Sequence, residues 1–246
     1  MGVPYDERFC RPYGLEGLFH RPIDPTRGFK YVVDPSTGLA REVTGTIDAE
    51  VRLLAAIAYG EGSTADVEDE IAGIAHAVVN RAKAWGNKKV SAVVAGDPNY
   101  TYAANGKNDR FNVLKAASLA AINKSKGMRI AINAAREALA GQGHDTSNDA
   151  YWWDGIDLKD KKSFNPRIQH GFKYGEPEHN IFDMDEITKP VVTYWQAKNP
   201  KTGQLENTKE RGRYDCVYRS TAAHGKTIFW RYTPEYVAAT GGKEYK

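Results

Sequence analysis

The sequence has no apolar run that approaches the roughly 20 residues needed to span a bilayer. Its start, MGVPYDERFCRPYG, is polar and broken by prolines, so we do not expect a secretory signal peptide there. A myristoylation signal is not expected either, because Asp6 stands where Ser or Thr is required. These absences predict no membrane span. If the protein acts outside the cell that makes it, we expect another device to carry it.

Cysteine is scarce, and basic charge is not concentrated. Cys10 and Cys216 lie too far apart in the sequence for a metal knuckle or a disulfide framework, although one pairing in an oxidising compartment stays open. The formal net charge is only +3, and the lysines and arginines are spread along the chain. Nucleic-acid binding is therefore not predicted. A weak cationic bias also suits an anionic polymer such as the bacterial cell wall.

The 246 residues fall into three compositional stretches, with neither an internal repeat nor a flexible linker between them. Residues 1–45 hold five of the 11 prolines and predict an irregular arm, with a short hairpin around YVVDPSTGLARE. Residues 46–145 carry helical periodicity. Residues 146–246 are aromatic and β-prone. We expect one domain over 1–246, mainly α within an α+β class, whose C-terminal part is irregular and partly β.

Two predicted helices enclose an acidic loop in the stretch AIAYGEGSTADVEDEIAGIAHAVVNRAKAWG. The first helix should start near Thr46 or Asp48 and end near Gly60–Gly62. The second should present one apolar stripe over 71–82 and stop at Gly86. Further along, DPNYTYAANGKNDRFN predicts a strand or turn region, and the alanine-rich stretches after it predict helices over 111–123 and 128–140, the latter ended by Gly141.

Glu61 is the first candidate for chemistry. It stands between two glycines at the end of an apolar helix, where loss of solvation should raise its pKa and keep it protonated. A protonated carboxyl group can act as the general acid in glycoside cleavage. An acid at a helix C-terminus also opposes the helix dipole, and residues that break a local rule are often functional.

Glycoside hydrolysis commonly uses a second, ionised carboxylate. Glu70 is the choice favoured here, because it lies in the first turn of the second helix and can be held rigidly toward the cleft. Asp66 and Glu68 are the alternatives. Acids before a helix are also ordinary capping chemistry, which alone would account for Asp66, Glu68 and Asp69.

The same stretch resembles the spore-cortex-lytic type of cell-wall hydrolases. In that family an apolar helix ends in a Gly-Glu pair, an acidic loop follows, and an alanine- and valine-rich helix closes with Asn-Arg. Glu61, Asn80 and Arg81 match this frame, with about one residue inserted in the loop. The strong similarity covers about 35 residues, and a weaker one extends to about residue 155.

The resemblance implies a lysozyme-like fold and cleavage between N-acetylmuramic acid and N-acetylglucosamine, with Glu61 as the acid and no metal or organic cofactor. The chain is also similar to the C-terminal domain of peptidoglycan-degrading type VI secretion effectors. That similarity implies delivery without a signal peptide, action in the periplasm of a target bacterium and a cognate immunity protein. The second carboxylate cannot be transferred from the family, and the aromatic C-terminal 90 residues have no counterpart in its short members.

Four aromatic residues are candidates for a glycan groove: Tyr100, Tyr102, Trp152 and Trp153. Sugars stack their apolar faces on aromatic rings while polar neighbours bind the hydroxyl groups. At least half of these residues, and one of the two tryptophans, are instead expected to pack in the core or sheet.

Three alternatives stay open beside a muramidase. A lytic transglycosylase would use the same glutamate and let the 6-hydroxyl group of the sugar attack. A Cys216–His224 pair could serve an amidase or endopeptidase, although that segment predicts a strand, not the helix start that activates such a cysteine. The third alternative is a wall-binding module without catalysis.

Overall fold

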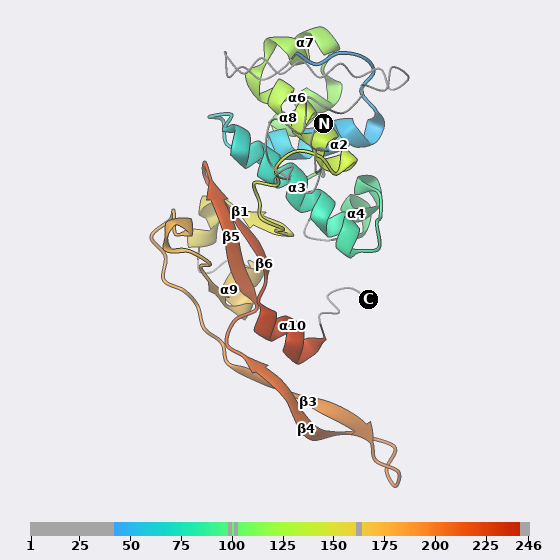
Figure 1. Ribbon diagram of the computed structural model, residues 1–246, viewed down its shortest axis with the longest axis vertical. Coiled ribbons are helices and arrows are strands. Elements are labelled where there is room, and N and C mark those ends of the chain that lie inside the picture. The colour runs from blue at the N-terminus through green and yellow to red at the C-terminus, as the bar shows by residue number, and fades with distance from the viewer. Residues whose placement is uncertain (1–41, 98–99, 101–102, 161–163, 242–246) are drawn as a thin grey trace, which may run out of the picture. The chain divides into compact units, whose positions relative to one another are not determined.

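The computed structural model describes residues 42–97, 100, 103–160 and 164–241 (Figure 1). The chain divides into two compact units, residues 1–39 and residues 40–246, and the described residues belong to the second. They form an α+β structure, as the sequence predicted. The predicted N-terminal arm lies almost entirely outside the described residues, as does its hairpin.

The described part of the chain contains eight α-helices and six strands. The helices are α2 (Ala49–Glu61), α3 (Glu68–Ala84), α4 (Val90–Gly96), α6 (Asp109–Ala116), α7 (Leu119–Lys124), α8 (Lys126–Ala140), α9 (Pro166–His170) and α10 (Pro234–Thr240). The strands are β1 (Trp152–Asp154), β2 (Phe172–Lys173), β3 (Val191–Lys198), β4 (Leu205–Tyr214), β5 (Tyr218–His224) and β6 (Thr227–Tyr232). Two short 3-10 helices cover Ile156–Lys159 and Pro177–His179.

Helices α2, α3 and α8 pack against one another and form the helical core (Figure 1). Asp48 caps α2 by accepting a 2.8 Å hydrogen bond from the Glu50 amide, and the helix ends at Glu61 as predicted. The apolar stripe of α3 is also confirmed, since Ile71, Ile74 and Val78 are fully buried. Many of their buried residues are alanines, among them Ala55, Ala75 and Ala131.

The predicted helix over 111–123 is wrong in one respect, because it is divided into α6 and α7. Ala117 is extended between them, and the Ser118 side chain accepts a hydrogen bond from the Ala121 amide and so starts a new helix. Local capping chemistry overrides the helical preference of the flanking alanines. Gly141 ends α8 in the left-handed conformation, as expected. Within the predicted strand or turn region, the described residues 103–108 contain turns and the cap of α6, and no strand.

A four-stranded sheet has the order β1-β6-β5-β2. Strands β5 and β6 form an antiparallel hairpin that turns at Gly225, which has a positive φ of 59°. Strand β1 pairs antiparallel with β6, with Trp153 opposite Phe229, and β2 runs parallel to β5. Helix α3 lies so close to this sheet that a Cβ at Gly73 would come within 2.6 Å of the Phe229 ring.

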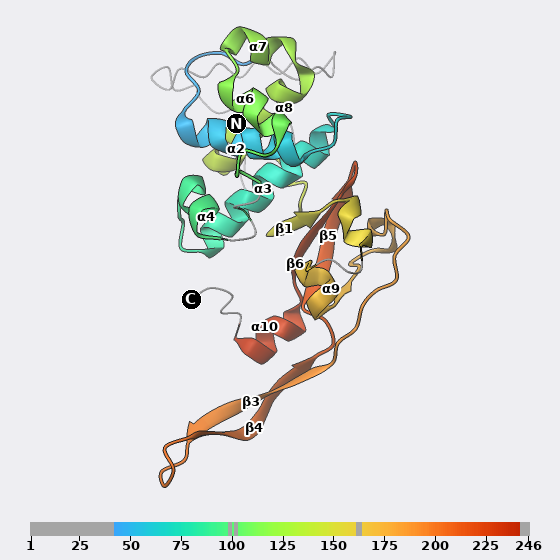
Figure 2. The ribbon, with the colours of Figure 1, turned by 180° about the vertical axis from the view of Figure 1, so that it is seen from behind.

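The remaining strands, β3 and β4, form a separate two-stranded antiparallel hairpin (Figures 1 and 2). Helix α10 packs on this hairpin near its base. Among the helices described, none is both long and apolar enough to cross a membrane.

Candidate active site

The end of α2 places Glu61 between two points of tight helix packing. A Cβ at Gly60 would lie 3.0 Å from Phe111 of α6, and a Cβ at Gly62 would lie 3.1 Å from Ile71 of α3. The two glycines therefore let α6 and α3 close around the helix end. This close packing leaves the Glu61 side chain half-buried.

Among the described residues, Glu61 has few hydrogen-bond partners for a carboxyl group in this position. The Trp153 indole Nε1 donates to Glu61 Oε2 over 3.4 Å, which is a long hydrogen bond. Burial raises the pKa of Glu61 above its ordinary value of 4.5, whereas hydrogen bonds from Trp153 and Asn108 act in the opposite direction. The nearby carboxylate of Asp157 raises that pKa further. The group is therefore biased toward its protonated form, which can donate a proton.

Glu61 opens onto a cavity of about 160 Å³. Its lining residues are Glu61, Tyr100, Ala103, Trp152, Trp153, Asp154, Pro166 and Arg167. The structure thus brings four sequence candidates together: the glutamate and three of the four aromatic residues. Tyr102 lies outside the described residues.

The three aromatic residues at this cavity differ in exposure. Trp153 is half-buried and bonds to Glu61, so it is the ring best placed to meet a ligand. Trp152 is 4% exposed and packs edge-on against Tyr218, which puts it in the core. Tyr100 is 1% exposed, and its ring meets Trp153 edge-to-face at 5.5 Å. Tyr100 therefore packs against Trp153 inside the protein. This corrects the expectation that Tyr100 is an exposed ring on which a sugar could stack.

An acid that the sequence analysis did not single out also lines the cavity. Asp154 forms a 2.8 Å ion pair with Arg167 and accepts a 2.6 Å hydrogen bond from Asn165. Burial raises the pKa of Asp154, and Arg167 and Asn165 oppose that rise. Asp157, in the short 3-10 helix that follows β1, is exposed. The motif YWWDG contained Asp154, but nothing in it indicated the partner Arg167.

Glu70 does not line this cavity, and this corrects the expectation that it faces the cleft. It is fully buried, and four donors surround its carboxylate. Ser63 donates from its amide at 3.2 Å and its hydroxyl at 2.5 Å, the Lys226 amide at 3.0 Å and the Thr227 hydroxyl at 2.8 Å. The physical reason is that Glu70 turns inward to tie the loop after α2 and the β5–β6 turn to the start of α3.

The other acids of the loop have separate roles. Asp66 forms a 2.7 Å ion pair with Arg110 and packs against the start of α8, where a Cβ at Gly127 would lie 2.2 Å from it. Glu68 and Asp69 are exposed in the first turn of α3, where negative charge suits the helix dipole. Of the five carboxylates between Glu61 and Glu70, only Glu61 lines the cavity.

Asn80 and Arg81, which complete the family frame, are supporting residues. Asn80 Nδ2 donates to Asp145 at 2.8 Å. Arg81 is 1% exposed, donates twice to Asp97 at 2.9 and 2.7 Å, and places its guanidinium 5.0 Å from the centre of the Trp152 ring. Through these contacts α3 fixes the strand that carries Trp153.

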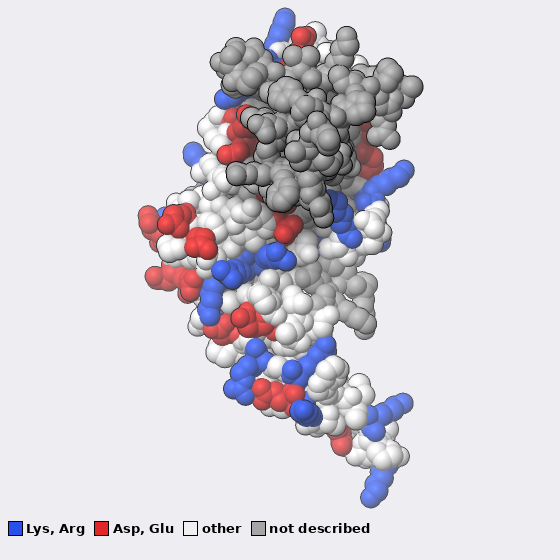
Figure 3. Space-filling view, in the orientation of Figure 1, with Lys and Arg blue, Asp and Glu red and all other residues white. Residues whose placement is uncertain are grey.

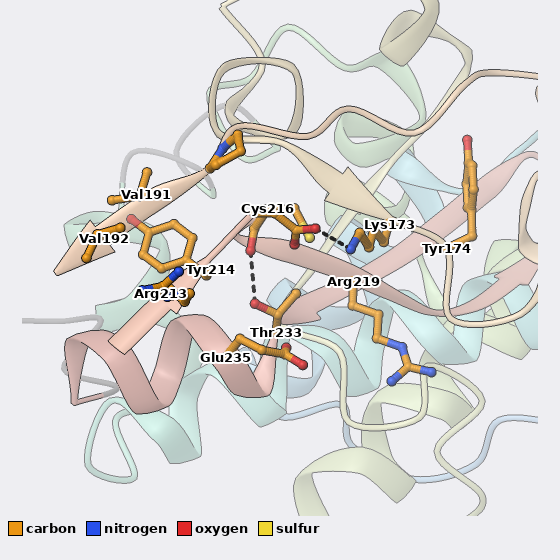
Figure 4. A pocket seen from close by; sticks show the side chains of 12 residues that line it. Lys173, Tyr174, Val191, Val192, Arg213, Tyr214, Cys216, Arg219, Thr233 and Glu235 are labelled. Atoms are coloured by element: carbon orange, nitrogen blue, oxygen red, sulfur yellow. Dashed lines mark hydrogen bonds and ion pairs between the residues drawn. The ribbon is translucent and has the colours of Figure 1, made fainter. Parts of the chain in front are cut away.

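A larger groove of about 600 Å³ lies elsewhere, around Cys216 at the root of the β3–β4 hairpin (Figure 4). Burial raises the pKa of the Cys216 thiol to about 12, so it is not poised as a thiolate. Cys216 lies just before β5, and His224 is the last residue of that strand. The extended chain therefore separates the two side chains by about 25 Å. This geometry gives no support to a cysteine amidase or endopeptidase.

The described residues contain no cluster of three or more His, Cys, Asp or Glu side chains that could hold a metal ion. No family model, curated protein or solved structure matches this chain. The interpretation of the cavity therefore rests on its own geometry and on the motif resemblance stated above.

Proposed function

We propose that this protein cleaves the glycan strands of bacterial peptidoglycan, with Glu61 as the general acid. The observation that carries the proposal is a half-buried glutamic acid of raised pKa, bonded to a tryptophan at the mouth of a cavity. Such a group donates its proton to a glycosidic oxygen, and the adjacent ring offers a surface for a sugar face. The proposed fold is lysozyme-like in its helical part, on the strength of the motif resemblance.

Two products are compatible with this chemistry. A muramidase adds water to the broken bond, whereas a lytic transglycosylase leaves an anhydro sugar formed by the 6-hydroxyl group. The sequestration of Glu70 favours the second candidate more than the sequence did, because that reaction manages with one glutamate. Asp157 is the exposed carboxylate whose charge reaches Glu61, so it is the residue through which a hydrolytic route would operate.

The biological setting belongs to the same proposal and rests on the resemblance to type VI secretion effectors. In it, the protein is delivered to the periplasm of a target bacterium, degrades the wall there as an antibacterial toxin, and is neutralised in the producing cell by an immunity protein.

The test is the release of muropeptides from purified sacculi by the wild-type protein and by Glu61→Gln. The amide keeps the shape of the protonated acid but has no proton to give, so release should fall by about 10²–10⁴-fold. Glu68→Gln is the matched control, because it removes an exposed carboxylate nearby and should retain activity. Mass spectrometry of the products distinguishes water addition from anhydro-sugar formation. Full activity of a folded Glu61→Gln variant would refute the proposal.

A further inference from the structure

The β3–β4 hairpin has no core of its own. None of the residues in its two strands is buried, and its apolar side chains are unusually open: Trp195 is 55% exposed and Leu205 65% exposed. An isolated two-stranded hairpin is marginally stable in water. Helix α10 covers only its base, where Thr193 donates a 2.8 Å hydrogen bond to the Ala239 carbonyl and Gly212 touches Ala239. Both ribbon views show the rest of the hairpin leading away from the four-stranded sheet (Figures 1 and 2).

The hairpin also has a net positive charge. Residues 191–214 contain five basic and two acidic residues, a net charge of +3, which equals the formal net charge of the entire chain. Both acids are engaged, since Glu210 accepts two hydrogen bonds from Arg213 and Glu206 accepts one from Asn199. Basic side chains line this segment in Figure 3. The sequence alone did not single out this segment, because lysines and arginines also occur throughout the rest of the chain.

Three lysines of the hairpin, Lys198, Lys201 and Lys209, are exposed and have no acidic partner among the described residues. Trp195 lies on the same hairpin, with the Arg211 guanidinium 4.4 Å from the centre of its ring. Exposed ammonium groups and an exposed aromatic ring on the same hairpin suit a polymer that carries both carboxylates and sugar rings. At the root, Arg213 and Arg219 line one groove together with the acidic residues Asp215 and Glu235, so the surface there is of mixed charge (Figure 4).

We propose that the β3–β4 hairpin anchors the protein to peptidoglycan by binding its acidic peptide stems and sugar rings through Lys198, Lys201, Lys209 and Trp195. This inference rests on the proposed function, because peptidoglycan is also the proposed substrate. A bilayer is the weaker partner, since polar residues such as Gln196 and Asn207 interrupt the apolar surface. The anchor lies outside the cavity that holds Glu61, so binding and cleavage are separable.

The test compares two triple variants of the full chain in a Glu61→Gln background, which prevents digestion of the wall. One carries Lys198→Gln, Lys201→Gln and Lys209→Gln. Its matched control removes three exposed lysines of the helical part by Lys89→Gln, Lys124→Gln and Lys126→Gln. Both lose the same charge, and equal melting temperatures would show that both stay folded.

Co-sedimentation with purified sacculi at low and high salt is the measurement. The hairpin triple variant should bind about tenfold more weakly at low salt, with a shallower salt dependence, while the control stays within about twofold. Trp195→Ala should weaken binding at both salt concentrations. Equal losses in both triple variants would overturn the inference. The inference would also be overturned if the hairpin triple variant bound sacculi normally and lost binding only to vesicles of equal parts phosphatidylcholine and phosphatidylglycerol, or only to duplex DNA.

Catalytically active versions separate this inference from the proposed function. With Glu61 restored, the hairpin triple variant should cleave short soluble glycan fragments at the wild-type rate and whole sacculi more slowly. Hairpin-dependent binding without any product from the wild-type protein would refute only the proposed cleavage. Normal cleavage with unchanged binding by the hairpin variants would refute only the anchor.

Discussion

Two carboxyl groups at neighbouring helix ends, one fully buried and one half-buried, have opposite surroundings. Glu70, in the first turn of α3, is fully enclosed and accepts four hydrogen bonds. Glu61, at the end of α2, is only half-buried, yet its one indole donor is 3.4 Å away. Donors replace the solvation that burial removes, and among the described residues Glu61 has only Trp153 and Asn108, fewer donors than Glu70 has. The less buried residue is therefore the better candidate for an acid catalyst.

The largest effect on stability should come from removing the enclosed carboxylate. Glu70→Ala would leave the buried Thr227 hydroxyl and the part-buried donors of Ser63 and Lys226 without an acceptor. Since an orphaned buried donor costs about 1–3 kcal/mol and the part-buried donors add to that cost, the free energy of unfolding should fall by roughly 3 kcal/mol. Chemical denaturation measures this change.

Glu70→Gln sharpens the comparison. It keeps one acceptor oxygen and should destabilise the protein less than Glu70→Ala. Its folded fraction should still release muropeptides at close to the wild-type rate. A stable Glu70→Gln variant that is inactive would restore Glu70 as a catalytic residue and remove the contrast drawn between the two carboxyl groups.

A smaller loss is expected where α3 meets the sheet. Gly73→Ala places a Cβ within 2.6 Å of the Phe229 ring, which must move. Overpacking of this kind costs about 1–3 kcal/mol. Val113→Ala is the control, because Val113 is 53% exposed and its truncation should change the free energy of unfolding little. Equal effects of the two substitutions would show that α3 does not press on β6.

The long helices α2, α3 and α8 were predictable from local chemistry, and the site was predictable only in part. The stripe of α3, the Asp48 cap and the Gly141 stop follow from spacing and residue type. Glu61 was identifiable because an acid at a helix end opposes the dipole. The prediction for Glu70 was wrong because two of its hydrogen-bond donors, Lys226 and Thr227, lie more than 150 residues away in the sequence.

The same limit explains the aromatic residues. Trp152 and Trp153 are adjacent in sequence, and β1 sends them to opposite sides, one into the core and one toward Glu61. A strand predicts that successive side chains point to opposite faces of the sheet, but it does not predict which face packs against the core. The partners that decide it, Tyr218 and Arg167, come from elements that the local pattern cannot place.

The smallest expected effect is a dependence of stability on pH. Because the folded-state pKa of Glu61 is raised, the stability linked to its neutral form is present at low pH and lost as pH rises through that pKa. Glu61→Gln cannot ionise, so it should become more stable than the wild type by about a few degrees in Tm near neutrality. Melting temperatures of the two proteins that coincide at low pH and differ more as pH rises would fit this prediction. A wild type that is the more stable protein at neutral pH would contradict it.

The most direct measurement of the role of Glu61 is the pH dependence of muropeptide release by the wild-type protein and by Trp153→Phe. In the wild type, activity should decline on the alkaline side at a pH above 4.5, the ordinary pKa of a glutamic acid. Phenylalanine keeps a ring beside the cavity but removes the indole donor that stabilises ionised Glu61, so the decline should move to higher pH. An alkaline limb at the same pH in both proteins would contradict Glu61 as the titrating acid.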